Sequence, residues 1–296
     1  MSKFKGLGVA LVTPFSENGN IDYAGLQRLI ELQLNGGTDY LVVHGTTGES
    51  VTLSADEKKA SLEFIQEINN GKLPVVIGIG GNNTREVCAQ LEAAYLSNVD
   101  GVLSVSPAYN KPTQNGIYAH FHAVANATDK DIILYNVPGR TGSNVTAETT
   151  VRCAEDFANI VAVKEASGNL EQTMQIIKNS PEGFSVLSGD DALALPVIAS
   201  GGDGLISVIG NAFPGIYAEM IHAVIEGRLP DARICHYQVF DLIHWLFADG
   251  NPGGIKEVLK YMNVCHNHVR LPLVPVGKSV SDKLYALLAE SELVMT

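Results

Sequence analysis

The chain has 296 residues, of which 46% are hydrophobic and 18% are charged. This composition is typical of a globular protein, and the length is enough for one large core. The net charge of −12, from 20 Lys and Arg against 32 Asp and Glu, disfavours binding to nucleic acid or to an anionic membrane surface. No apolar run approaches the roughly 20 residues that a membrane-spanning helix needs.

The cysteines lie far apart in the sequence and form no CxxC motif. We interpret them as free thiols or small buried hydrophobic residues, which is typical of a reducing compartment. The sequence therefore predicts a cytoplasmic protein. The four positions are Cys88, Cys153, Cys235 and Cys265.

Short runs that are apolar along almost their whole length recur through the first 208 residues. Such runs are expected of parallel strands whose two faces are both buried. We predict eight strands, at 8–12, 40–44, 75–79, 101–105, 132–136, 160–164, 185–188 and 204–208.

A helical pattern follows each of these runs. The second pattern opens with SADE at 54–57, a capping-box sequence. The third carries Val87, Leu91, Ala94 and Tyr95 on one helical face. We predict helices near 23–35, 54–69, 84–98, 115–127, 146–156, 169–179, 192–200 and 213–226.

The strict alternation of eight strands with eight helices predicts a (β/α)₈ TIM barrel, which is an α/β fold. A doubly wound open sheet has the same local pattern and is the alternative. Because such barrels run to about 250 residues as one domain, we expect residues 1–226 to form a catalytic barrel. Three further helices, at 230–247, 253–262 and 280–290, would form a C-terminal helical appendage over residues 227–296.

In a barrel of this kind, catalytic groups lie at the carboxyl ends of the strands and in the loops after them. Lys164 ends the sixth predicted strand, and a long cation is unusual where a buried strand stops. An amine there can attack a ketone and form a Schiff base. The other strands end in GTTGE at 45–49, in a loop with Tyr109, in Tyr135 followed by Arg140, and in SGDD at 188–191.

Each of these groups also has a simpler interpretation. A lysine at a strand end is usually a solvated terminator, and Arg140 alone is most often a surface cation. Tyr135 can be a core aromatic residue whose hydroxyl is satisfied. The glycines at 45–48 can form an ordinary turn, although the amides of such a turn can also bind a carboxylate. The functional interpretation is favoured because all of these groups fall on one rim.

Other chemistries find little support in the sequence. The glycine clusters at 78–81 and 201–204 lack the GxGxxG spacing, and no GxSxG occurs. The two HxH pairs, at 120–122 and 266–268, are followed by no third ligand in an obvious register. We therefore expect no metal and no cofactor.

With these residues in place, the chain resembles the dihydrodipicolinate synthase family, also called the 4-hydroxy-tetrahydrodipicolinate synthases. The resemblance covers nearly the whole chain, and its most specific motifs are GTTGE at 45–49, YNVPGRT at 135–141 and VKEASG at 163–168. Members of this family are Schiff-base lyases that condense pyruvate with L-aspartate 4-semialdehyde on the diaminopimelate route to lysine. The resemblance thus implies a TIM-barrel lyase that acts on small molecules without a cofactor.

The resemblance also implies a role for each matching residue. Lys164 would form the Schiff base with pyruvate, and Tyr135 would act as general acid and base. Thr47 would link Tyr135 to Tyr109, which reaches in from the neighbouring subunit of a tight dimer, and two such dimers would form a homotetramer. The pyruvate carboxylate would be held by Gly45, Thr46 and Thr47, the semialdehyde carboxylate by Arg140, and the backbone contacts near pyruvate would come from Gly189 and Ile206.

In relatives that lysine inhibits, the effector binds a cleft at the tight-dimer interface. The positions that match this cleft and keep its polar character are Ser50, Asn82 and Glu86. Sensitive relatives usually carry His, His and Tyr at three other positions, which here are Ala55, Lys58 and Ala108. Lys58 would repel an effector with two ammonium groups, unless it turns into solvent and meets the effector's carboxylate. We therefore predict weak or absent inhibition by L-lysine.

Two alternatives to this activity remain. The first is another Schiff-base pyruvate lyase on the same barrel, such as N-acetylneuraminate lyase or a keto-deoxy-sugar aldolase. Sialic acid lyases, however, typically carry Ser where Thr46 stands and lack an arginine that matches Arg140. The second is a keto-acid binding or sensor barrel without catalysis, which the complete set of Lys164, Tyr135 and Thr47 argues against.

Overall fold

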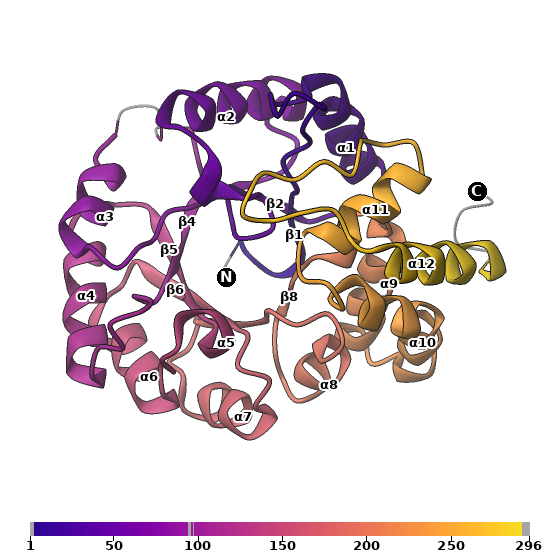
Figure 1. Cartoon of the computed structure of the whole chain (residues 1–296). Coiled ribbons are helices and arrows are strands. Elements are labelled where there is room, and N and C mark those ends of the chain that lie inside the picture. Colours follow the sequence, from indigo (N-terminus) through magenta and orange to yellow (C-terminus); the bar gives the residue numbers. More distant parts are fainter. Residues whose placement is uncertain (1–2, 94–95, 97, 292–296) are drawn as a thin grey trace. The chain divides into compact units, whose positions relative to one another are not determined.

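The computed structural model of the chain describes residues 3–93, 96 and 98–291. Eight strands follow one another in chain order and close into a parallel barrel (Figure 1). This confirms the predicted (β/α)₈ fold and excludes the open doubly wound sheet. The strands are β1 (Gly6–Ala10), β2 (Tyr40–Val43), β3 (Val75–Gly78), β4 (Gly101–Val105), β5 (Asp131–Asn136), β6 (Ile160–Glu165), β7 (Ser185–Ser188) and β8 (Gly204–Ser207).

The strands form where the sequence is continuously apolar. Every residue of β1, β2, β7 and β8 is buried, as a parallel sheet that is covered on both faces requires. All eight predicted strands agree with the observed ones to within two residues at either end. The local hydrophobic pattern alone was therefore sufficient to locate them.

The helices follow the strands in alternation. They are α1 (Tyr23–Asn35), α2 (Ala55–Asn69), α3 (Thr84–Leu91), α4 (Gln114–Asn126), α5 (Pro138–Thr141), α6 (Ala147–Asp156), α7 (Leu170–Asn179), α8 (Ala194–Ala199), α9 (Pro214–Ile225), α10 (Leu229–Leu246), α11 (Gly253–Tyr261) and α12 (Lys278–Glu290), with short 3₁₀ turns η1 (Ser50–Thr52) and η3 (Ile209–Asn211). The capping box predicted at the start of α2 is present, with Ser54 and Glu57 each bonding the other's backbone N–H.

Two helices differ from the sequence prediction. Helix α3 ends at Leu91, because the next backbone N–H, that of Glu92, bonds to Gln90 and leaves the helical ladder. Ala94 and Tyr95, which we had assigned to the same helical face, lie outside the described residues. Helix α5 was not predicted, since four residues are too few to show a helical period.

The chain forms two compact units. The first comprises residues 1–6 and 74–206. In it, α3 packs on α4, α4 on α6 and α6 on α7, and these helices lie outside the strands β3 to β7 (Figure 1). The strands thus supply the buried layer of this unit and the helices its cover.

The second unit comprises residues 7–73 and 207–296 and contains β1, β2, α1, α2 and α9 to α12. Helix α10 packs along α9, and α11 packs against both α10 and α12. The start of α11 approaches α10 so closely that a Cβ on Gly254 would lie 2.2 Å from the carbonyl oxygen of Leu246. Only glycine allows this contact.

The predicted separation of a barrel (1–226) from an appendage (227–296) differs from these two units and stays a prediction. Within the described residues, no helix is long and apolar enough to cross a membrane.

Candidate active site

Lys164 and Tyr135 lie side by side on neighbouring strands of the first unit. Strands β5 and β6 pair with Tyr135 opposite Lys164, and the Lys164 Nζ atom lies 4.4 Å from the centre of the Tyr135 ring. Only 6% of Lys164 and 7% of Tyr135 are exposed. Lys164 is therefore a buried amine and not a solvated strand terminator.

Burial lowers the pKa of Lys164 to about 8, because the charged ammonium form loses its hydration. Two nearby charges act on the same group in opposite directions. Asp191, itself buried, raises this pKa, and Arg140 lowers it. The neutral amine, which is the nucleophilic form, is thus accessible close to neutral pH.

Gly189 provides the space that the Lys164 side chain occupies. A Cβ on Gly189 would lie 3.0 Å from Cε and 3.1 Å from Cγ of Lys164. The Gly189 N–H donates to the carbonyl of Glu165 at 2.7 Å, so the backbone after β7 is held against the end of β6. Ile206 lies on β8 and is fully buried.

A buried polar cluster fixes the strand ends that carry the two reactive side chains. The side-chain amide of Asn136 donates to both carboxylate oxygens of Glu165, at 3.0 and 3.2 Å. Glu165 also accepts from the Ser167 N–H at 2.7 Å. Since Asn136 and Glu165 directly follow Tyr135 and Lys164, the cluster restricts the orientation of both.

Arg140 and Tyr109 belong to adjoining segments of the first unit. Arg140 is exposed on α5, whose first position is Pro138. The Tyr109 N–H donates to the carbonyl of Thr141, the residue after Arg140, at 3.1 Å. Tyr109 has φ of +75°, a conformation that is uncommon for a residue with a side chain, and 83% of it is exposed. The loop therefore holds Tyr109 away from the core of its own unit.

The predicted anion-binding segment forms a tight loop in the second unit. The Gly48 N–H donates to the Gly45 carbonyl at 3.1 Å, and the Glu49 N–H donates to the Thr46 carbonyl at 3.0 Å. Thr46 is exposed, whereas Thr47 is buried. Glu49 has φ of +53°, as has His44 at the start of the loop. Such residues persist only where neighbouring contacts fix them.

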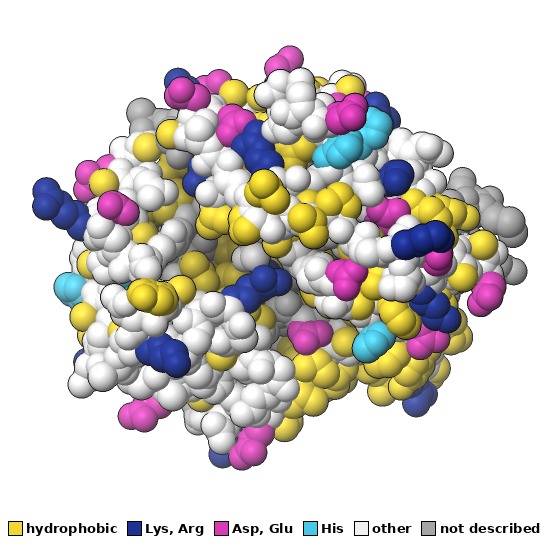
Figure 2. All heavy atoms as spheres, viewed as in Figure 1, with side chains coloured by type: hydrophobic (Ala, Val, Ile, Leu, Met, Phe, Trp, Pro, Cys, Tyr) yellow, Lys and Arg dark blue, Asp and Glu magenta, His cyan; other side chains and the backbone are white. Residues whose placement is uncertain are grey.

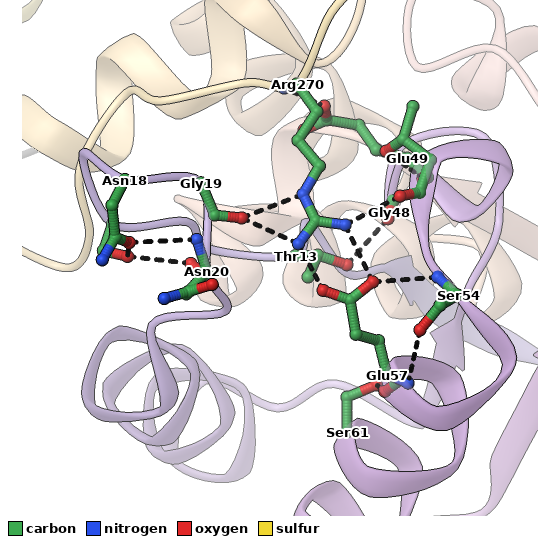
Figure 3. A network of polar contacts seen from close by, with 12 residues as sticks. Thr13, Asn18, Gly19, Asn20, Gly48, Glu49, Ser54, Glu57, Ser61 and Arg270 are labelled. Atoms are coloured by element: carbon green, nitrogen blue, oxygen red, sulfur yellow. Dashed lines mark hydrogen bonds and ion pairs between the residues drawn. The ribbon is translucent and has the colours of Figure 1, made fainter.

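Side chains of α2 and of the segments after β1 and β2 supply part of these contacts, some of which Figure 3 shows. The Thr13 hydroxyl donates to the Gly48 carbonyl at 2.7 Å, and His44 Nε2 lies 2.9 Å from the Ser61 hydroxyl. Because that hydroxyl donates its proton to the carbonyl of Glu57, His44 must be the donor. Burial lowers the pKa of His44 to about 4, so the imidazole is neutral.

The end of the loop is held by an ion pair buried in the second unit. Lys256 Nζ lies 2.5 Å from Glu49 Oε1, and neither side chain is more than 1% exposed. The other carboxylate oxygen accepts from the Arg270 N–H at 2.9 Å. The Arg270 guanidinium in turn pairs with Glu57 of α2, as Figure 3 shows. Phe15 lies beneath both cations, with Lys256 Nζ 4.3 Å from its ring centre.

Three residues of the site were missed by sequence reasoning. Asp191 lies in the SGDD segment that we had noted, but a carboxylate partner for Lys164 was not inferred. Asn251 donates from Nδ2 to the Thr47 hydroxyl oxygen at 2.9 Å. Asn251 and Lys256 lie more than 200 residues after the loop that they hold. No local pattern marks either of them, so only the folded chain could reveal these contacts.

The remaining predicted positions are distributed over the two units. In the first, Asn82 precedes α3 and Glu86 lies in its first turn, and both are exposed. In the second, Ser50 begins η1 and is half-buried. The structure thus groups Lys164, Tyr135 and Gly189 closely and keeps Gly45, Thr46 and Thr47 in one loop. The described residues contain no cluster of three or more His, Cys, Asp or Glu side chains that could hold a metal ion.

We expect the two charges near Lys164 to move its pKa in opposite directions. Asp191→Asn removes a charge that raises the pKa, so the pKa should fall. Arg140→Ala removes a charge that lowers the pKa, so the pKa should rise. Competitive reductive methylation of Lys164 over a pH series, read by peptide mass spectrometry, measures both shifts. Asp190→Asn changes the adjacent carboxylate and serves as the matched control. Shifts of the same sign in the two variants would contradict this account.

Comparison with known proteins agrees with the geometry over almost the whole chain. The model of the dihydrodipicolinate synthetase family matches residues 3–291. A 4-hydroxy-tetrahydrodipicolinate synthase of Flavobacterium psychrophilum is 48% identical over 284 residues, which cover 96% of this chain and 97% of that protein. The crystal structure of the Thermotoga maritima dihydrodipicolinate synthase has a TM-score of 0.96 at 39% identity and covers 99% of this chain and 100% of that one. The chloride-inhibited enzyme of Acinetobacter baumannii, complexed with pyruvate, has a TM-score of 0.94 at 36% identity, with 98% and 99% covered. The chain therefore belongs to the dihydrodipicolinate synthetase family.

Proposed function

We propose that this protein is a 4-hydroxy-tetrahydrodipicolinate synthase, a lyase that condenses pyruvate with L-aspartate 4-semialdehyde in lysine biosynthesis by the diaminopimelate route. The observation that carries the proposal is the buried Lys164 amine, whose pKa of about 8 leaves it nucleophilic, next to Tyr135. The similarity of the chain to synthases along nearly its full length supports this choice.

The chemistry begins when the neutral Lys164 amine attacks the keto carbon of pyruvate. Loss of water from the carbinolamine gives a protonated imine, which withdraws electrons and makes the methyl group acidic. Removal of a methyl proton gives an enamine, whose carbon attacks the aldehyde of the second substrate. Hydrolysis of the imine then returns the free Lys164 amine. The imine itself accepts the electrons, so these steps need no cofactor.

Hydroxyl groups move the protons between these steps. Tyr135 is buried beside the Lys164 amine and serves as general acid and base. Thr47 and Tyr109 complete the relay in our proposal. Each assisted proton transfer typically contributes about 10²–10⁴-fold to the rate.

The two carboxylates of the substrates are bound by different means. The backbone amides of Gly45, Thr46 and Thr47, together with the Thr46 hydroxyl, bind the carboxylate of pyruvate, in the manner of a backbone anion nest. Arg140 binds the carboxylate of the semialdehyde, because a guanidinium can hold it by two parallel hydrogen bonds. Its exposure on α5 leaves it accessible to a ligand.

Arg140 also separates this activity from that of the related lyases. Sialic acid lyases typically lack a matching arginine and carry Ser where Thr46 stands. A barrel that only binds a keto acid, without catalysis, would not require a buried lysine with a lowered pKa. Arg140 and Thr46 therefore favour the synthase over the related lyases, and Lys164 favours an enzyme over a binding barrel.

Borohydride added together with pyruvate should inactivate the enzyme and leave a reduced pyruvyl adduct on the peptide that contains Lys164. A coupled assay with both substrates and a downstream reductase should show turnover in the untreated protein. Lys164→Arg should abolish both the adduct and the turnover, whereas Lys178→Arg, an exposed lysine of α7, should affect neither. An adduct on any other lysine would refute the assignment.

We further propose that the protein acts in the cytoplasm as a homo-oligomer, a tetramer built from tight dimers. Exposed apolar side chains support self-association. Tyr109 is exposed in the first unit, and in the second Val51 is 92% exposed. Hydrophobic side chains also gather over α10 (Figure 2). Those of α10 include Ile234, Tyr237 and Phe240.

The exposed face of α10 is self-complementary. Ile234 and Phe240 lie three residues on either side of Tyr237, and Arg233 and Asp241 lie four residues on either side. Two antiparallel copies of α10 related by a twofold axis at Tyr237 would therefore pair apolar residues at the centre and opposite charges at both ends. This pattern supports contact between two copies of the chain as the second interface of the tetramer.

The role of Tyr109 can be tested by complementation between subunits. Tyr109→Phe and Lys164→Ala should each be nearly inactive. If Tyr109 serves the neighbouring subunit, a mixed dimer contains one site with both changes and one site with neither. Activity should then return when the two variants are refolded together, but not when each is refolded alone. If Tyr109 served its own subunit, every site would keep one change and no activity would return.

We also propose that L-lysine inhibits this enzyme weakly or not at all. Lys58 of α2 is half-buried, and burial lowers its pKa, so a cation here is already costly. A second cation from the effector would add repulsion that solvent screens only in part. Ser50, Asn82 and Glu86 remain as the polar residues of the proposed cleft.

A dose–response assay at fixed pyruvate should show little inhibition at lysine concentrations that inhibit sensitive relatives. The double variant Lys58→His with Ala108→Tyr should become more sensitive to lysine. It removes the repelling Lys58 cation and introduces the tyrosine that sensitive relatives usually carry at position 108. Lys59→His, at the exposed neighbouring position, is the matched control and should change nothing. Strong, saturating inhibition of the unmodified protein would disprove this account.

A further inference from the structure

Asn251 makes a buried contact with a residue of the proposed proton relay. It lies between α10 and α11, and its Nδ2 donates to the Thr47 hydroxyl oxygen at 2.9 Å. Asn251 is 8% exposed and Thr47 is 3% exposed. The contact thus joins the C-terminal region to the anion-binding loop within the second unit.

The direction of this hydrogen bond constrains the Thr47 proton. A hydroxyl group has one proton and can accept on its oxygen at the same time. Because the Asn251 amide donates, the Thr47 oxygen is the acceptor, and its own proton must point away from Asn251. The Thr47 hydroxyl that accepts from Asn251 can therefore donate its proton toward the other groups of the proposed relay.

The backbone of the loop does not need Asn251 to keep its path. The first residue of the loop, His44, is held by its hydrogen bond with Ser61. The turn is held by Thr13 through the Gly48 carbonyl, and the last residue, Glu49, is held by its ion pair with Lys256. These contacts involve the backbone or the flanking side chains, whereas the side-chain hydrogen bond that Asn251 makes within the described residues goes to the Thr47 hydroxyl. The contribution that is specific to Asn251 is the orientation of that hydroxyl.

Among the described residues, the Asn251 amide is oriented by its contact with Thr47. Its Oδ1 atom is buried and accepts no hydrogen bond from the residues that the structure describes.

We propose that Asn251 is a positioning residue that fixes the direction in which Thr47 donates its proton in the relay. The inference rests on the proposed function, because it assigns a task within that relay. It also means that the C-terminal region contributes to catalysis through Asn251.

Two variants test the polarity of the contact. Asn251→Asp replaces the donor by an acceptor, so the Thr47 proton should turn toward it and leave the relay. This variant should lower kcat by about 10²-fold, the size of one lost proton transfer. Asn251→Ala only releases the hydroxyl and should lower kcat less. Since the loop stays in place, the KM for pyruvate should remain close to that of the unmodified protein in both.

A double-mutant cycle with Thr47→Val separates positioning from a general structural effect. Without the hydroxyl, Asn251 has nothing to orient, so adding Asn251→Asp to Thr47→Val should cause no further loss of kcat. The solvent deuterium isotope effect on kcat should rise in Asn251→Asp, because proton transfer becomes slower. Asn69→Asp is the matched control, since Asn69 is also buried in the second unit but its Nδ2 bonds the Leu73 carbonyl.

The outcomes distinguish this inference from the proposed function. No turnover by the unmodified protein would overturn the proposed function itself. Turnover by the unmodified protein with an equally active Asn251→Asp would overturn the inference alone, and so would additive losses in the cycle. If Asn251→Asp does not fold, as circular dichroism would show, Asn251→Ala takes its place in the same cycle with the same expected non-additivity.

Discussion

A parallel sheet that is covered on both faces leaves a charged side chain only one position, the end of a strand. Lys164 occupies that position on β6 and is still buried, so its ammonium form is disfavoured and its pKa falls to about 8. Lys256 is buried as deeply, and burial lowers its pKa as well, but the carboxylate of Glu49, 2.5 Å away, opposes that shift. The two buried lysines therefore differ in their surroundings, since Lys256 is paired with a carboxylate whereas Lys164 lies beside the Tyr135 ring.

The Glu49–Lys256 pair explains how a strained loop persists. Two residues of that loop have positive φ angles, and the pair together with Arg270 holds the second of them. Removing one partner of such a buried pair typically costs about 3–5 kcal/mol, because the other charge is left uncompensated. The loop is thus held in place, as the proposed binding of a carboxylate by its backbone amides would require.

Several residues of the candidate site support Tyr135 and Lys164 and take no part in the proposed chemistry. Asn136 and Glu165 restrict the strand ends that carry Tyr135 and Lys164, and Gly189 leaves space for the lysine side chain. The strands already determine where Tyr135 and Lys164 lie along the chain, and these contacts restrict the orientation of their side chains.

The sequence by itself determined the eight strands, the TIM barrel and the place of Lys164 at the end of a buried strand. These features depend on local patterns, since continuous apolar runs mark buried strands and Lys164 stands out at the end of one. Only the tertiary structure decided how Lys164 is tuned and how the loop at 45–49 is held. Asp191, Asn251 and Lys256 act on residues to which no local pattern relates them, and a contact across some 200 residues leaves no periodic trace in the sequence. Burial and hydrogen-bond direction are properties of the folded environment, so they became visible only when the chain was folded.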